Sequence, residues 1–124
     1  MNLVEEYYML VSEVVSNKES VHDNKTAEEH NNKVNRMCAI AMIIEQAAPE
    51  LKSDFFKLIS NENSEIRLWV AHHILEYMNY DRYFRKCALR EIRHKARMDH
   101  TVYGFGERVW LKDWYKTHPQ DRWI

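Results

Sequence analysis

The scarcity of glycine and proline is the feature that most limits what this chain can fold into. Its 124 residues include only two glycines and two prolines. Apolar residues recur at spacings of three and four along the sequence, the period of an amphipathic helix rather than of a strand. The pattern therefore predicts an all-helical fold.

Six helical segments are expected from this periodicity. They span residues 2–16, 26–47, 50–60, 64–78, 81–97 and 101–117. Thr26 and Glu29 form a capping box at the start of the second segment. Pro49 ends that segment, because the residue before a proline avoids the helical region. Residues 17–25 fit either an ordered loop or a flexible linker.

The helices that follow residue 50 are short and are separated by tight turns. Such a succession is typical of antiparallel helical hairpins. A hairpin of two amphipathic helices buries its remaining face only by stacking on a neighbour. The favoured fold is therefore all-α, a short right-handed α-solenoid of about six helices. The whole chain, 1–124, is expected to form a single helical-repeat domain.

The stretch NSEIRLWVAHHIL, residues 63–75, has the shape of the second helix of a HEAT-type repeat. A polar turn leads to Ile66 and Arg67, and Ala71 allows two helices to approach closely. We expect Arg67 to bond across the turn to a carboxylate or to carbonyl groups of a neighbouring repeat.

A wider resemblance extends from about residue 50 to the end of the chain. It is carried by Ile66 to Ala71, Leu89, Ile92, Ala96, Gly104, Phe105, Leu111, Lys112 and Trp114. On these residues the chain resembles a small bacterial family of HEAT/ARM-like (armadillo-like) proteins of unknown function. Gly106 departs from the pattern, since an alanine-like residue is usual there. The resemblance implies a protein-interaction module, and some small proteins of this kind resemble immunity proteins that neutralise the toxins of competing bacteria.

The two glycines, Gly104 and Gly106, raise the alternative of a phosphate-binding loop. Such a loop follows a strand and places its glycines before the helix. Here the glycines follow a predicted helix, and Gly106 lies inside the next helical pattern. We expect Gly104 to open the last helix and Gly106 to let it pack closely on its neighbour, at a cost of about 1 kcal/mol relative to alanine.

Charge is distributed unevenly along the chain. Residues 1–66 carry twelve acidic and six basic side chains, and residues 67–124 carry seven and twelve. Seven of those basic residues lie in 82–97, where Glu91 is the one acid. This strip is either a solvated helix face or a surface for an acidic protein or for phosphates. The net charge of −1 argues against nucleic-acid binding by the chain as a whole.

The adjacent histidines, His72 and His73, raise the question of a metal site. Neighbouring residues on a helix point about 100° apart, whereas two zinc ligands on one helix share a face. We therefore expect no metal. His73 falls on the apolar stripe and is expected to be a satisfied, partly buried histidine, while His72 points away from it and is free to meet a partner. Cys38 and Cys87 are expected to be small core residues in a reducing cytosol.

Motifs for catalysis and targeting are weak. The sequence has no nucleophile elbow and no inward-facing carboxylate–histidine repeat, so we expect a protein that is not an enzyme and needs no cofactor. The first residues carry acids where a signal peptide carries bases. No apolar run approaches the length of a transmembrane helix. These features predict a cytoplasmic protein that does not bind membranes.

The aromatic content favours a binding surface. Eleven residues are Trp or Tyr, and only three or four of them can fill the core of so small a chain. The others either cover seams between helices or act as binding hot spots, in which Trp, Tyr and Arg are enriched.

Our first hypothesis is an immunity or antitoxin-like protein that covers the active cleft of a toxin. The acidic N-terminal half suits a basic nuclease toxin, because opposite charge raises the association rate. The candidate partner-binding residues are Glu28, Glu29, His72, Glu76, Arg108, Trp110 and Lys112. The alternative is a nucleic-acid-binding HEAT-like protein that uses the basic helix 82–97.

Overall fold

The computed structural model describes residues 1–17 and 24–124. Its α-helices are α1 (Leu3–Ser16), α2 (Asn24–Ala47), α3 (Lys52–Phe56), α4 (Ser64–Tyr77), α5 (Arg82–Met98) and α6 (Val102–Thr117). Three 3-10 turns complete them: η2 (Pro49–Leu51), η3 (Lys57–Ser60) and η4 (Pro119–Trp123). The all-helical fold is confirmed, and the described residues contain no strand. Most of the segment whose order the sequence left open, residues 18–23, lies outside the described residues.

Three of the α-helices begin at a side chain that caps them. The side chain of Asn63 accepts hydrogen bonds from the backbone nitrogens of Glu65 (2.8 Å) and Ile66 (3.2 Å) and so caps α4. Asn2 caps α1 and Thr101 caps α6 in the same way. Side-chain acceptors at these positions satisfy backbone donors that have no partner within the helix.

Two of the expected boundaries need correction. Helix α2 begins at Asn24, so Thr26 lies inside the helix rather than at its cap. The segment 50–60 is not one helix but the series η2, α3 and η3. Pro49 does end α2 as predicted, because α2 stops at Ala47 and Pro49 is the first residue of η2.

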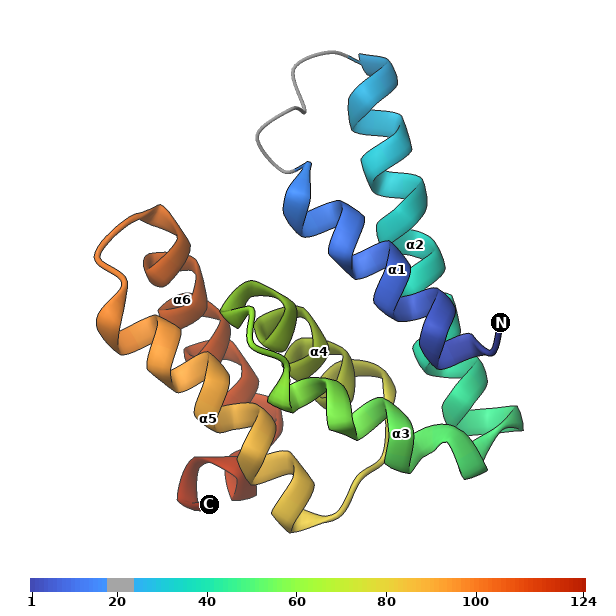
Figure 1. Ribbon diagram of the computed structural model, residues 1–124. Coiled ribbons are helices and arrows are strands. Elements are labelled where there is room, and N and C mark those ends of the chain that lie inside the picture. Colours follow the sequence, from blue (N-terminus) through green and yellow to red (C-terminus); the bar gives the residue numbers. More distant parts are fainter. Residues whose placement is uncertain (18–23) are drawn as a thin grey trace.

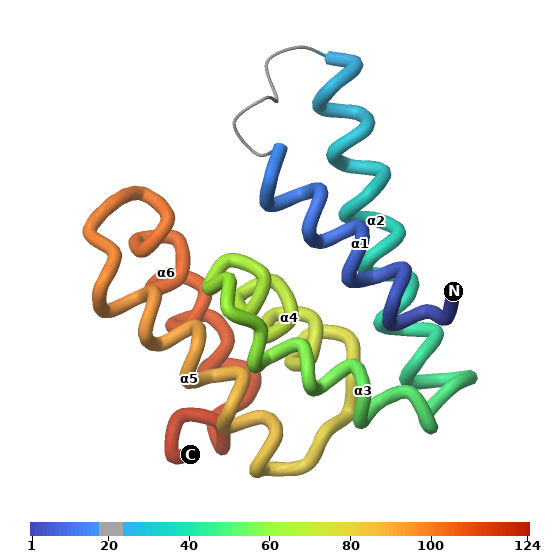
Figure 2. Tube along the Cα trace, viewed as in Figure 1, coloured from blue at the N-terminus to red at the C-terminus, as the bar shows by residue number. Residues whose placement is uncertain are grey.

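The helices form consecutive antiparallel pairs (Figure 1). Helices α1 and α2 make a hairpin, the α3–η3 segment packs along α4, and α5 lies beside α6. The tube in Figure 2 shows α4 in the middle of the molecule, between the hairpin and α5. Helix α4 is therefore the element through which the N-terminal hairpin and the C-terminal pair are connected.

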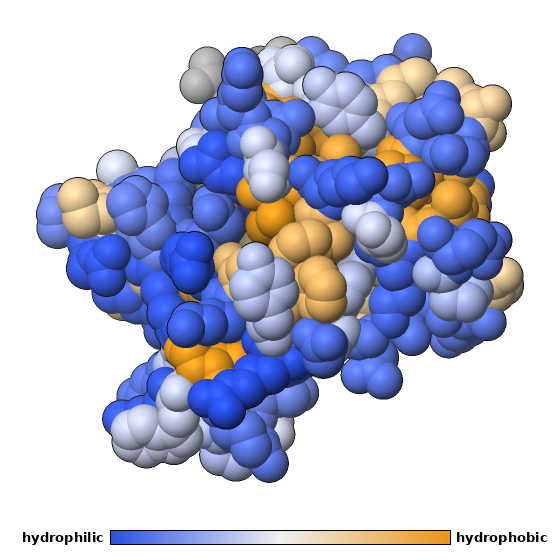
Figure 3. All heavy atoms as spheres, turned by 60° about the horizontal axis from the view of Figure 1, so that its bottom comes forward, coloured by the Kyte–Doolittle hydropathy of each residue, from blue (hydrophilic) through white to orange (hydrophobic). Residues whose placement is uncertain are grey.

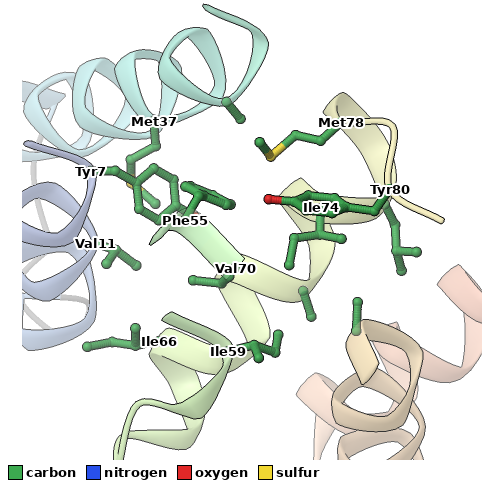
Figure 4. Packing of buried hydrophobic residues seen from close by; sticks show 14 of the residues in the cluster. Tyr7, Val11, Met37, Phe55, Ile59, Ile66, Val70, Ile74, Met78 and Tyr80 are labelled. Atoms are coloured by element: carbon green, nitrogen blue, oxygen red, sulfur yellow. The ribbon is translucent and has the colours of Figure 1, made fainter. Parts of the chain in front are cut away.

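The core lies where the hairpin, α3 and α4 meet (Figure 4). Tyr7 of α1, Met37 of α2, Phe55 of α3 and Val70 of α4 are all fully buried there. The rings of Tyr7 and Phe55 meet edge to face, with centroids 4.7 Å apart, the geometry that aromatic pairs prefer. Aromatic and aliphatic side chains from four elements thus fix how the hairpin sits on α4.

Cysteines and aromatic residues differ in part from expectation. Cys38 and Cys87 are free thiols, but both are half-buried rather than fully in the core. Of the Trp and Tyr side chains, Tyr7 and Tyr80 are buried. Those that are exposed are Tyr8, Tyr83, Tyr103 and Trp123. The prediction that most aromatic residues reach the surface at least in part is confirmed.

Arg67 makes the bonds that the sequence predicted for it. Its Nε donates to Oε1 of Glu91 on α5 (2.9 Å). Its Nη1 donates to the backbone oxygens of Asn61 (2.8 Å) and Glu62 (3.1 Å) in the turn before α4. One guanidinium therefore holds that turn and the next helix pair together, and such charge-assisted bonds are among the stronger ones in proteins.

The two glycines agree only in part with expectation: Gly104 lies in the first turn of α6 as expected, but the close approach occurs there and not at Gly106. A Cβ atom on Gly104 would lie 1.8 Å from the backbone oxygen of Asp99, whereas one on Gly106 would meet nothing within 4 Å. Gly104 is buried in the first turn of α6, and Gly106 is exposed. The close approach therefore occurs at Gly104, because Gly106 lies about 200° further round the helix and faces solvent.

The surface is largely polar on the face that Figure 3 shows, with apolar residues visible between hydrophilic ones. None of the helices in the described part of the chain has the length and apolar character needed to cross a bilayer.

Candidate functional site

A cleft of about 600 Å³ opens between the N-terminal hairpin and the C-terminal helices. Helices α1 and α2 form one wall, α4 forms the floor, and α5 and α6 form the other wall. The lining residues are Val14, Val15, His30, Glu65, Leu68, Trp69, His72, His73, Glu76, Lys95, Tyr103 and Glu107. A concave site lined by apolar, aromatic and a few charged groups is the usual form of a binding pocket.

The floor of the cleft contains a hydrogen-bonded cluster, which we call the His72 cluster: His72, Glu76, Glu107 and Trp110. The Nε2 atom of His72 lies 2.8 Å from Oε2 of Glu107, and its Nδ1 lies 3.5 Å from Oε1 of Glu76. The indole nitrogen of Trp110 donates to the same oxygen of Glu76 at 2.8 Å. The Trp110 and His72 rings meet edge to face at 4.5 Å. The cluster therefore bonds α4 to α6.

His72 carries a positive charge at neutral pH. Burial by itself would lower its pKa, but the hydrogen bonds to Glu107 and Glu76, together with their charges, raise that pKa to about 9. Burial would raise the pKa of Glu76, and its bonds to His72 and Trp110 outweigh this and lower it. The cluster thus holds one imidazolium between two carboxylates.

His73, the next residue, is in the opposite state. Its Nδ1 lies 2.6 Å from the hydroxyl oxygen of Tyr7, and its Nε2 lies 3.7 Å from Sγ of Cys38. Its side chain is almost fully buried, and this burial lowers its pKa to about 4, so the ring is neutral at pH 7. The prediction of a satisfied core histidine is confirmed for His73.

The structure brings only some of the candidate partner-binding residues together. His72, Glu76 and Trp110 meet in the cluster, but His72 is only 17% exposed and is not free for a partner. Arg108 donates from Nη1 to the backbone oxygen of Ala96 (2.7 Å) and to that of Asp99 (3.2 Å). Its guanidinium therefore binds carbonyl groups at the end of α5.

The remaining candidates lie outside the cleft. Lys112 is exposed on α6 and does not line it. Glu28 and Glu29 are exposed near the start of α2, beside His30, which does line the cleft. These three side chains are therefore surface groups that do not contribute to the lining of the cleft.

Of the residues that line the cleft, only His72 and Glu76 were expected from the sequence to bind a partner; Glu107, Tyr103 and Trp69 are among those that were not. Glu107 and Trp110 are three residues apart on α6, and positions three apart share a helix face. This spacing places Glu107 on the same side of α6 as Trp110. The sequence contained that information, but it did not say which residue of α4 would lie opposite.

The basic residues of the strip 82–97 on α5 fall into two groups in the structure: some bind other parts of the chain, and the others are exposed. Arg93 donates to the hydroxyl of Tyr115 (2.8 Å) and to the backbone oxygens of Ile124 (2.6 Å) and Asp121 (2.7 Å). Arg85 pairs with the side chain of Asp121, which also accepts from Trp114 at 2.8 Å. Two of the strip's arginines therefore bind the chain's own C-terminal turn. The exposed members of the strip are Arg82, Lys86, Arg90 and Arg97.

Among residues 1–17 and 24–124, no group of three or more His, Cys, Asp or Glu side chains is placed to hold a metal ion. Comparison with known proteins finds no matching family model, no matching curated protein and no matching solved structure. The resemblance to HEAT/ARM-like proteins therefore stays a prediction from the residues that carry it.

Proposed function

We propose that the protein is a non-enzymatic interaction module that binds a polypeptide partner in the cleft. One observation carries this proposal: a cleft of about 600 Å³ whose walls come from two separate parts of the fold and combine aromatic rings with ionised side chains. Aromatic and charged residues at the centre of a concave surface are the usual energetic anchors of protein interfaces.

The His72 cluster supports this proposal because it makes the floor of the cleft rigid. Trp110 donates a hydrogen bond of 2.8 Å to Glu76, and His72 forms an ion pair with the same carboxylate at 3.5 Å, so these side chains restrain one another. Side chains that are already ordered lose less conformational entropy on binding, so more of the contact energy appears as affinity.

We further propose that the helix pairs form a short right-handed HEAT/ARM-like solenoid. The consecutive antiparallel pairs and the bond from Arg67 to the next pair support this arrangement. In solenoids of this kind the partner usually occupies an extended concave surface.

The biological role that fits best is that of an immunity protein whose partner is a toxin domain. A Kd of about 1 nM, roughly −12 kcal/mol, is needed for neutralisation at low concentration. A standard interface of roughly 1,600 Å² provides such affinity when a few anchors are well buried. The excess of acidic residues in 1–66 supports a basic partner, for which long-range attraction raises the association rate.

The test uses the polypeptide encoded by the adjacent reading frame. We expect a 1:1 complex by size-exclusion chromatography with light scattering, and inhibition of the partner's activity in the complex. Tyr103→Ala should weaken the complex at least about tenfold in calorimetry, since truncating a hot-spot side chain costs more than 1 kcal/mol. Tyr83→Ala is the matched control, because Tyr83 is as exposed (65%) as Tyr103 (69%) but lies outside the cleft. If Tyr83→Ala weakened the complex and Tyr103→Ala did not, this result would contradict binding of the partner in the cleft.

The alternative function is nucleic-acid binding by the exposed part of the α5 strip. Arg82, Lys86 and Arg90 are exposed at intervals of four residues, so they form a row on one helix face. Phosphate contacts by such a row predict affinity that falls steeply with salt. Filter binding of a DNA duplex between 50 and 200 mM salt, with Arg90→Gln as the variant, decides between the two functions.

A further inference from the structure

The charges of the cleft point to the chemistry of the group that enters it. Three carboxylates line it, those of Glu65, Glu76 and Glu107, against the cations His72 and Lys95. The ammonium of Lys95 is bound by Asp99, which does not line the cleft, at 2.7 Å. The lining is therefore more negative than positive and attracts a cation.

We propose that the cleft binds a basic side chain of the partner, arginine in preference to lysine, with its charged end at Glu76 and Glu107. This inference rests on the function proposed above and names the group that is recognised. The carboxylates already hold one planar cation, since the imidazolium of His72 lies between them at 2.8 and 3.5 Å. The pair is thus arranged to accept N–H donors from a flat cationic group.

Both carboxylates keep an oxygen for a second cation. His72 bonds to Oε2 of Glu107, and His72 and Trp110 bond to Oε1 of Glu76. Within the described residues, the other oxygen of each carboxylate accepts no hydrogen bond. The side chains of Glu76 and Glu107 are 31% and 16% exposed, so an incoming group can reach them.

The walls suit the rest of an arginine side chain. Val14, Val15 and Leu68 provide apolar surface for the methylene stem, which basic side chains bury while the charged end stays polar. Trp69 and Tyr103 provide aromatic faces, and guanidinium groups bind such faces by cation–π attraction. The guanidinium is favoured over the ammonium because it is planar, stacks on rings and bonds two oxygens at once.

The test titrates the ¹⁵N-labelled full chain with N-acetyl-arginine amide, and with N-acetyl-citrulline amide as the uncharged analogue of the same shape. We expect saturable shifts of the amide resonances of the lining residues with arginine, with a Kd on the order of millimolar. We expect binding of the citrulline compound to be at least about tenfold weaker, because it lacks the charge. Equal binding of the two compounds would overturn the inference.

Variants separate recognition from folding. Glu107→Gln and Glu76→Gln should each weaken arginine binding at least about fivefold, because each removes one of the two carboxylates at the end of the cleft. Glu50→Gln removes an exposed carboxylate outside the cleft, so it is the matched control and should bind like the unaltered chain. Tyr103→Leu removes only an exposed ring, so it tests the aromatic wall without disturbing the core.

The two proposals fail in distinguishable ways. A tight polypeptide complex together with no arginine binding in the cleft overturns the cation inference and leaves the interaction function standing. Arginine binding that Glu107→Gln abolishes, together with no polypeptide complex, supports the cation site and contradicts the interaction function.

Discussion

The two sides of α4 are held to their neighbours by different forces, and the adjacent histidines mark the division. His73 faces the N-terminal hairpin, is neutral and bonds to the buried hydroxyl of Tyr7. His72 faces α6, is charged and bonds to the carboxylate of Glu107. Two adjacent residues of α4 thus contact different regions: an apolar region on the side of the hairpin and an ionic region on the side of α6.

The difference extends through both regions. On the hairpin side, α1 and α2 bury side chains such as Val11, Met37 and Ile44 completely. Helix α6, in contrast, buries only Gly104 and Leu111, and polar bonds to α4, α5 and η4 hold it. Apolar burial is nearly independent of pH and salt, whereas charge-assisted bonds depend on both. The C-terminal region should therefore respond to solution conditions that leave the hairpin unchanged.

The largest effect is expected from Phe55→Ala on the apolar side. Phe55 is fully buried against Tyr7, so its truncation should cost roughly 3–5 kcal/mol of the free energy of unfolding. Urea denaturation should give the same loss at low and at high salt. Phe56→Ala is the control, because Phe56 is only half-buried and should cost less. If the loss of unfolding free energy caused by Phe55→Ala became markedly smaller at high salt, the hairpin side would not be held by apolar burial.

Asp121→Asn should have the next largest effect and should act on the ionic side. Asp121 is 5% exposed, and its side chain accepts bonds from Arg85 and Trp114. Removing its charge leaves the half-buried Arg85 without its ion-pair partner, which should cost about 3 kcal/mol. Hydrogen exchange should then accelerate in η4 and at the start of α5 but not in α1. Asp113→Asn, at an exposed ion pair with Lys116, should change stability by less than about 0.5 kcal/mol.

The pH dependence of stability should divide between the two histidines. The folded pKa of His72, about 9, lies above the unfolded value of 6.5. Its contribution of roughly 2–3 kcal/mol is therefore complete below pH 6.5 and is lost as the pH rises through 9. The folded pKa of His73, about 4, lies below 6.5, so its contribution is present above pH 6.5 and is lost as the pH falls towards 4.

Unfolding free energies of two variants between pH 4 and 10 check this division. His72→Gln should flatten the alkaline side of the stability profile, and His73→Gln should flatten the acidic side. If both variants changed the same side, the assignment of one charged and one neutral histidine would be wrong.

The smallest effects are expected at the two glycines of α6. Gly104→Ala should destabilise by about 2 kcal/mol, because its Cβ would overlap the backbone oxygen of Asp99. Gly106→Ala should stabilise by up to about 1 kcal/mol, because it raises helix propensity in open space. Thermal unfolding of the two variants side by side measures both. Equal effects would mean that α6 does not rely on close backbone contact.

The fold could be predicted from the sequence where local physics decides it. Apolar spacing and capping residues such as Asn63 set the helices, and Pro49 ends α2. The burial of His73 followed from its place on the apolar stripe. Arg67 could be assigned because its partners lie in the adjacent turn and the next helix.

The site could be predicted only in part, because it depends on how helices are rotated against one another. The bond between His72 and Glu107 joins residues 35 positions apart, and periodicity gives the face of each helix but not which residues meet. The same limit concealed that Arg85 pairs with Asp121 in the C-terminal turn. The tight contact of Gly104 has another cause, because it is made with the backbone of Asp99 only five residues earlier, and apolar spacing carries no information on such a turn.

The position of the tryptophans gives the molecule a built-in fluorescence reporter. All four of them, Trp69, Trp110, Trp114 and Trp123, lie in the second half of the chain. Trp110 stacks on Trp114, and Trp114 on His118, with ring centroids 4.8 and 3.7 Å apart. Trp110, Trp114 and Trp123 belong to α6 and η4, so their emission reports the ionic region, whereas Trp69 packs near His73 on the other side of α4. A Trp69→Phe variant therefore gives the cleaner reporter, and far-ultraviolet circular dichroism reports all helices. Coincident denaturation curves from the two signals would show a single cooperative unit, and separated curves would give the order in which the regions unfold.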